Sequence, residues 1–148
     1  MTTRHPVIVT CERCGTALTG PLLVTEPAQL ADDTQDGAPT LAPGLVVRDP
    51  QPVLTWTHHA NGPTTSTQHS PADCAVVHPD TTQNLRTAGT DNGCCGSDGL
   101  DGPNRACTGC GLLTATARTD CWTAHEVRFL PHATTLIPEP PAYSTSAH

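Results

Sequence analysis

The chain has 148 residues and a formal net charge of −7, and its seven basic residues are all arginine. This length predicts one domain. The acidic balance argues against non-specific binding to nucleic acid or to an anionic membrane. No apolar run approaches the ~18 residues that a membrane-spanning helix needs. The N-terminus has no apolar export-signal core, so the sequence predicts a cytoplasmic protein with reduced thiols.

The composition predicts a weak hydrophobic core. Only 3% of the residues are aromatic, whereas 15 are proline and 12 are glycine. The chain also has eight cysteines. Structural zinc sites supply apparent binding energies of about 10–16 kcal/mol. We therefore expect bound metal ions to supply stability that the apolar side chains lack.

The N-terminal segment predicts a hairpin over residues 6–25. Residues 6–10 are rich in β-branched side chains and predict a strand. The turn Cys11-Glu12-Arg13-Cys14-Gly15 follows, in which two intervening residues let both sulfurs face one metal. The glycine can adopt the positive φ of a tight turn. Residues 16–25 predict the returning strand.

The middle of the chain predicts strands separated by loops. Strands are expected at residues 45–48 and 53–57, with Trp56 as a core anchor. Residues 26–44 and 60–72 are polar and rich in turn-forming residues, which predicts loops.

A third strand is predicted at residues 74–78. Cys74 and His78 would share one face of it, because residues four apart on a strand point to the same side. They are candidate metal ligands, or else a packed thiol and a histidine bonded to the backbone. A capping-box pattern starting at Asp80 predicts a short helix over residues 81–87.

Five of the eight cysteines fall between residues 92 and 128: Cys94, Cys95, Cys107, Cys110 and Cys121. Cys107-Thr108-Gly109-Cys110-Gly111 repeats the pattern of the first turn. Two such turns in one chain are typical of zinc held by thiolates.

A second hairpin is predicted over about residues 105–130. It would pair residues 112–118 with 122–130, and by the two-residue period of a strand Glu126 and Arg128 should be exposed. The proline-rich residues 131–148 predict an extended tail. The expected fold is thus one mainly β domain over residues 1–130, with one short helix and an irregular, zinc-stabilised core.

Two groupings of the cysteines into metal sites fit the sequence, and two zinc ions are expected. In the local grouping, Cys107, Cys110 and Cys121 share an ion with Cys94 or Cys95. Cys11 and Cys14 would then join the other vicinal cysteine and Cys74 or His78. In the alternative, the two C-x-x-C turns share one ion. The local grouping is preferred because shorter loops cost about 1–2 kcal/mol less entropy to close.

The motifs CERCG and CTGCG resemble the zinc knuckles of zinc-ribbon and rubredoxin-like modules. This resemblance covers the two turns and implies metal binding. More loosely, GCCGSDGLDGPNRACTGCG with the following DCWTAHEVRF looks like small cysteine-rich proteins of unassigned function from actinobacteria.

Sites filled with thiolates leave no open metal position for a substrate, which favours a structural, non-catalytic module that binds another protein. A nucleic-acid-binding or transcription-regulating zinc module is the first alternative, and the acidic charge disfavours it. A redox-labile zinc switch and a metalloenzyme are further alternatives. The chain lacks the H-E-x-x-H and zinc-deaminase patterns, so no catalytic residue is predicted.

Overall fold

The computed structural model describes residues 5–31, 37–89, 96–121 and 123–139. Over these residues the chain forms eleven β-strands and two short 3₁₀ turns, which confirms a mainly β fold. No helix in the described part is long and apolar enough to cross a membrane. The elements are β1 (Val7–Cys11), β2 (Leu23–Val24), η1 (Pro27–Gln29), β3 (Leu45–Asp49), β4 (Val53–Thr57), β5 (Thr65–Ser70), β6 (Cys74–Val77), η2 (Pro79–Thr81), β7 (Leu85–Thr87), β8 (Arg105–Cys107), β9 (Leu113–Arg118), β10 (Glu126–Phe129) and β11 (Thr134–Pro138).

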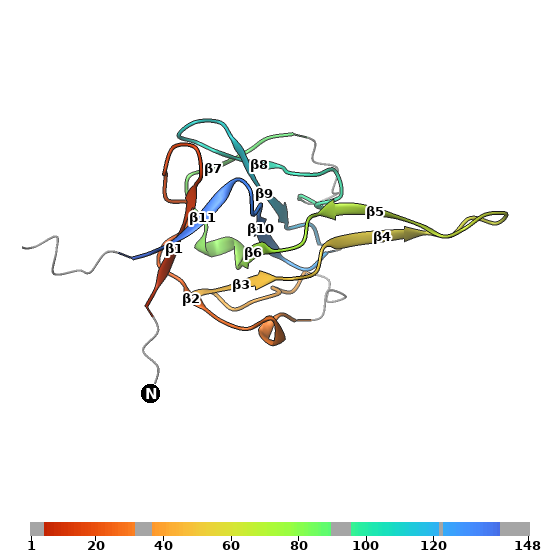
Figure 1. The fold of residues 1–148 in the computed structure, drawn as a ribbon, viewed down its shortest axis with the longest axis horizontal. Helices are drawn as coiled ribbons and strands as arrows, with labels where there is room; N and C mark the ends of the chain where they lie inside the picture. Colours follow the sequence, from red (N-terminus) through yellow and green to blue (C-terminus); the bar gives the residue numbers. More distant parts are fainter. Residues whose placement is uncertain (1–4, 32–36, 90–95, 122, 140–148) are drawn as a thin grey trace, which may run out of the picture.

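A seven-stranded sheet in the order β2-β3-β6-β10-β9-β8-β7 forms the body of the molecule (Figure 1). Its neighbouring strands are antiparallel, except for the parallel pair of β2 and β3. Strand β10 lies between β6 and β9, so Val127 is opposite both Val77 and Ala117. The predicted pairing of residues 112–118 with residues 122–130 is confirmed by the pairing of β9 with β10.

The main core lies between this sheet and a ribbon made by β1 and β11. Val9 from β1 packs in one buried cluster with Val127 and Phe129 from β10. The returning segment of the first hairpin adds Leu18 and Leu22, which are 0% and 2% exposed. The predicted return of the chain is present as isolated bridges from Val7 to Leu22 and from Thr10 to Ala17, but the continuous strand expected over residues 16–25 is not, because β2 pairs with β3.

The opposite face of β10 holds charged side chains, and they are buried. Glu126 and Arg128 are 1% and 3% exposed, so the expectation that they face solvent is wrong. Glu126 Oε2 accepts hydrogen bonds from Arg118 at 3.2 Å and from Arg128 at 3.0 Å. Arg128 also donates to Asp49 at 2.6 Å. A two-residue period distinguishes the two faces of a strand, but it does not tell which face is buried.

Strands β4 and β5 form a separate two-stranded sheet that projects from the body as an arm (Figure 1). Most of its side chains are exposed, and Trp56 is 61% exposed, so the prediction that Trp56 anchors the core is wrong. Strand β5 lies within the predicted loop 60–72. Its sequence TSTQHS lacks the hydrophobic alternation that identifies a strand with one buried face.

The predicted helix over residues 81–87 is also wrong. The 3₁₀ turn η2 ends at Thr81, and residues 85–87 form β7, which pairs with β8. His78, not Asp80, caps the turn, because its Nδ1 accepts a hydrogen bond from the Asp80 amide at 3.0 Å. The backbone amide of Gln83 donates a hydrogen bond to Leu18 O at 2.9 Å. Contacts with distant segments thus replace the local helix.

The predicted tail begins too early. Residues 134–138 form β11, which pairs antiparallel with all five residues of β1, from Val7 with Pro138 to Cys11 with Thr134. Residues 140–148 lie outside the described part of the chain. The proline content of residues 131–148 does not predict that β11 pairs with β1.

We predict that β11 is required for full stability. A chain ending at residue 131 should melt at a lower temperature than a chain ending at Glu139, because only the shorter chain lacks the partner of β1. Thermal unfolding followed by circular dichroism provides the measurement. Equal melting temperatures would contradict a stabilising role for the pairing of β1 with β11.

Candidate metal centre

The two C-x-x-C turns lie side by side at the end of the molecule opposite the arm (Figure 1). Each turn is closed by the same hydrogen bond, from Gly15 N to Cys11 O at 2.9 Å and from Gly111 N to Cys107 O at 2.8 Å. Both glycines have positive φ, of 77° and 82°. The backbone thus has the knuckle conformation that the trailing glycines predict.

The four sulfurs of the turns form one compact cluster. Cys11 Sγ lies 3.6 Å from Cys110 Sγ, Cys14 Sγ lies 3.6 Å from Cys107 Sγ, and all four lie within 4.8 Å of one another. These separations are too long for a disulfide bond of about 2.05 Å. Four sulfurs about 2.3 Å from a tetrahedral metal would lie about 3.8 Å apart. The cluster therefore has the size that one tetrahedral ion requires.

Regular strands place the first cysteine of each turn. Cys11 is the last residue of β1 and is opposite Thr134 of β11, while Cys107 is the last residue of β8 and is opposite Leu85 of β7. Both are buried, at 2% and 0% exposed. The cluster therefore joins the β1 hairpin to the edge of the main sheet. Cys11 and Cys110 are 99 positions apart in the chain.

Two polar groups lie within hydrogen-bonding distance of the sulfurs. The Gly109 amide donates a hydrogen bond to Cys107 Sγ at 3.3 Å, and Thr16 Oγ1 lies 3.0 Å from Cys14 Sγ. Hydrogen bonds from Thr16 lower the pKa of Cys14 to about 6, whereas burial raises the pKa of Cys11 to about 11. The lowered pKa of Cys14 favours its thiolate, which is the form that binds a metal ion.

Gly109 marks the point where the two turns meet. A Cβ atom at this position would collide with Thr16 Oγ1 and would lie 3.2 Å from Cys14 Sγ. A residue with a side chain would therefore push the turns apart. The sequence does not identify the roles of Thr16 and Gly109, because neither belongs to a ligand pattern and both roles depend on contact between distant turns.

The structure favours the shared grouping of the turns over the preferred local one. Cys121 is not in the cluster, and its Sγ lies 3.9 Å from Asp120 Oδ1. Cys74 is buried and its thiol donates to Pro71 O at 3.4 Å. The predicted ligands Cys94 and Cys95 lie outside the described residues. The local grouping failed because strand pairing, and not loop length, brings the turns together.

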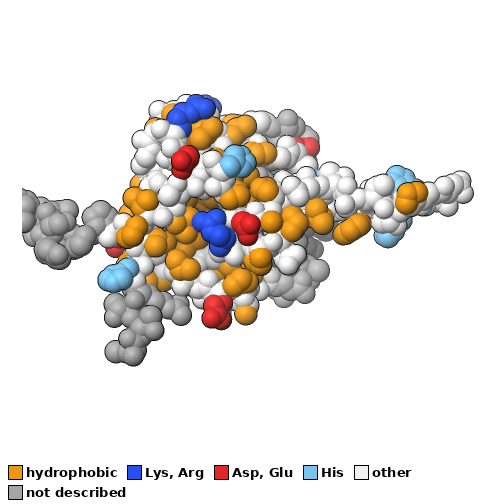
Figure 2. Space-filling model, in the orientation of Figure 1, with side chains coloured by type: hydrophobic (Ala, Val, Ile, Leu, Met, Phe, Trp, Pro, Cys, Tyr) orange, Lys and Arg blue, Asp and Glu red, His pale blue; other side chains and the backbone are white. Residues whose placement is uncertain are grey.

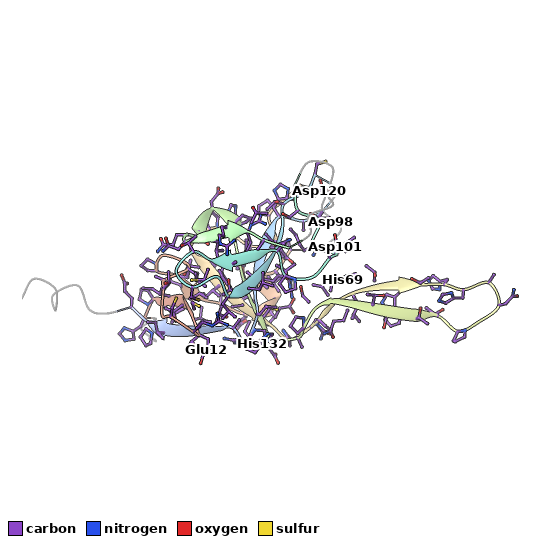
Figure 3. All side chains as sticks on the ribbon, turned by 90° about the horizontal axis from the view of Figure 1, so that it is seen from above. Glu12, His69, Asp98, Asp101, Asp120 and His132 are labelled. Atoms are coloured by element: carbon purple, nitrogen blue, oxygen red, sulfur yellow. The ribbon has the colours of Figure 1, made fainter. Side chains whose placement is uncertain are left out.

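His78 and the acidic side chains also lie outside the sulfur cluster. His78 caps η2, as described above. Figure 3 shows Asp98, Asp101 and Asp120 together at one corner of the body, well separated from Glu12 of the first turn. Over the described residues, the four-cysteine cluster is the one group of at least three metal-binding side chains close enough to share an ion.

Comparison with known proteins found no family, no characterised protein and no solved structure that matches this chain. The four-cysteine cluster therefore carries the functional argument.

We predict that Gly109→Ala weakens metal binding at least about tenfold, because the added methyl group separates the two turns. Gly20→Ala is the matched control, since a Cβ at Gly20 would meet no atom within 4 Å. Competition with a chromophoric chelator measures both affinities. Equal affinities would show that the turns need not meet as closely as the structure indicates.

We also predict that Thr16→Val makes metal release occur at higher pH. Without the hydroxyl, the pKa of Cys14 rises from about 6 toward its ordinary value of 9.0, so protons compete better with the metal. Release during acid titration should therefore begin sooner than in the unmodified protein. Thr108→Val, an exposed change in the other turn, should leave the titration unchanged. Identical curves for Thr16→Val and the unmodified protein would contradict the role of the hydroxyl.

Proposed function

We propose that this protein is a structural zinc-binding module without catalytic activity, which holds one Zn²⁺ through Cys11, Cys14, Cys107 and Cys110. The observation that carries the proposal is the all-sulfur cluster. Four thiolates are a common ligand set for structural zinc, and they fill every position of its tetrahedron. A water molecule or substrate then has no position at the metal, so hydrolytic zinc chemistry is disfavoured.

The proposed ion would stabilise the contact between two turns that are far apart in the chain, since Cys14 and Cys107 are 93 positions apart. It would hold the β1 hairpin against the β8–β9 turn, where Leu85 and Leu112 also pack against the core. Cys11 and Cys107 already belong to the buried core cluster, together with Val9 and Phe129. Metal binding and core packing would therefore stabilise the same contact, and loss of the ion should loosen both.

Two knuckles that share one ion are the arrangement that the resemblance to zinc ribbons implies. Many such modules bind other macromolecules, and we propose that this one binds another protein in the cytoplasm. The net charge of −7 favours a protein over nucleic acid as the partner. The projecting arm, with exposed Leu54 and Trp56, supports the proposal, because exposed aromatic side chains are common in protein interfaces.

The expected second ion stays a prediction. Cys94 and Cys95 lie outside the described residues, and Cys121 is exposed beside Asp120. A second site would have to combine these cysteines, whereas the first site needs none of them.

Native mass spectrometry with and without a chelator tests the proposal. The protein should retain one Zn²⁺ at the four-cysteine cluster, and Cys107→Ser should lose it and melt at a lower temperature. Cys121→Ser is the control and should keep that ion. Bound iron instead of zinc, disulfides among the four cysteines, or unchanged melting after the metal is removed would each contradict the proposal.

A further inference from the structure

A pocket of about 390 Å³ lies where the arm meets the body. One wall is formed by apolar side chains of the arm, including Leu54 and Trp56, and the floor includes Arg128, Glu126 and Asp49. Leu54 and Trp56 are two positions apart on β4, so both side chains point to the same side of the strand. The volume falls within the range of about 300–1,000 Å³ typical of ligand pockets.

Figure 2 shows hydrophobic side chains at the junction of arm and body, beyond which the arm stands clear. In Figure 1 the sulfur-bearing turns lie on the other side of the body. The pocket is therefore a separate surface from the metal centre, and changing one need not disturb the other.

The charges in the pocket balance. Two guanidinium groups, Arg118 and Arg128, line it together with the carboxylates Glu126 and Asp49. An anionic ligand would approach Glu126, and a cationic ligand would approach Arg128; each of these side chains is almost completely buried. Because like charges repel most strongly where water is excluded, the pocket suits a neutral ligand that both donates and accepts hydrogen bonds.

The pocket also offers hydrogen bonds to a ligand. The exposed Gln51 side chain adds an amide that can donate and accept.

We propose that this pocket binds an extended segment of the partner protein, with an apolar side chain against Trp56 and a peptide group at the polar floor. A peptide group is neutral and offers one donor and one acceptor, which matches the balanced floor. In the described structure β4 pairs only with β5, so its other edge can pair with an added strand. This inference rests on the proposed interaction function.

Three small probes that share one aromatic ring test the charge argument on the full, zinc-loaded chain. They are N-acetyl-L-phenylalaninamide, which is neutral, N-acetyl-L-phenylalanine, which is anionic, and 2-phenylethylamine, which is cationic. The neutral amide should bind most tightly, with a Kd of about 1 mM as expected for a ligand of this size. In ¹H–¹⁵N correlation spectra its shifts should centre on residues 51–56.

Exposed positions of the pocket supply the variants, since they can be changed without breaking the buried ion pairs. Trp56→Ala and Gln51→Ala should each weaken binding of the neutral amide about 5- to 10-fold, by loss of one aromatic contact or of one hydrogen-bonding side chain. Ile137→Ala on β11 is the matched control, because Ile137 is 39% exposed and does not line the pocket. It should bind as the unmodified chain does.

The inference is overturned if no probe binds, if a charged probe binds more tightly than the neutral amide, or if all three variants bind equally. Cellopentaose is tested in parallel, and shifts from it alone at residues 51–56 would assign the pocket to a carbohydrate instead. Failure of the probes on zinc-loaded protein would leave the proposed zinc site intact. Absence of zinc from the purified protein would overturn the proposed function, whether or not the probes bind.

Discussion

The approach of Cys11 and Cys14 to Cys107 and Cys110 is the constraint on which the rest of the structure depends. Cys14 and Cys107 are 93 positions apart in the chain, yet the four sulfurs of the two turns lie within 4.8 Å of one another. This contact joins the β1 hairpin to the main sheet, where Val9 and Phe129 belong to one buried cluster. Closing so long a loop costs entropy, and each further doubling of loop length adds only about 0.6 kcal/mol. The pairing of β1 with β11 and a bound ion would together offset that cost.

The buried charged side chains on β10 are a second constraint on the fold. Burying Glu126 alone would cost several kcal/mol, and hydrogen bonds from two arginines reduce this cost. Burial by itself would lower the pKa of Arg128, but Glu126 and Asp49 raise it, so the guanidinium stays charged. This charged network lies on the face of β10 opposite to its apolar face. It fixes the direction of several side chains next to the base of the arm.

Sequence patterns predicted the local elements and missed the long-range contacts. Strands β1, β3, β4 and β9 were identified within a residue or so, because β-branched residues and flanking turns mark them. The arm strand β5 and the edge strand β7 were missed, since neither has an alternating apolar face. Trp56 and Arg128 were assigned to the wrong environments for a related reason. Periodicity separates the two sides of a strand, and only tertiary structure decides which side is covered.

The same distinction applies to the candidate site. The C-x-x-C-G spacing alone identified the four cysteines, because two intervening residues fix the geometry within each turn. It could not pair one turn with the other, since that depends on strand order. Loop-closure entropy favoured a local site by only about 1–2 kcal/mol. The five residue pairs between β1 and β11 and the four between β9 and β10 favour the observed arrangement, and they outweigh this entropic preference for a local site. Sheet topology therefore outweighs chain proximity in deciding which thiols meet.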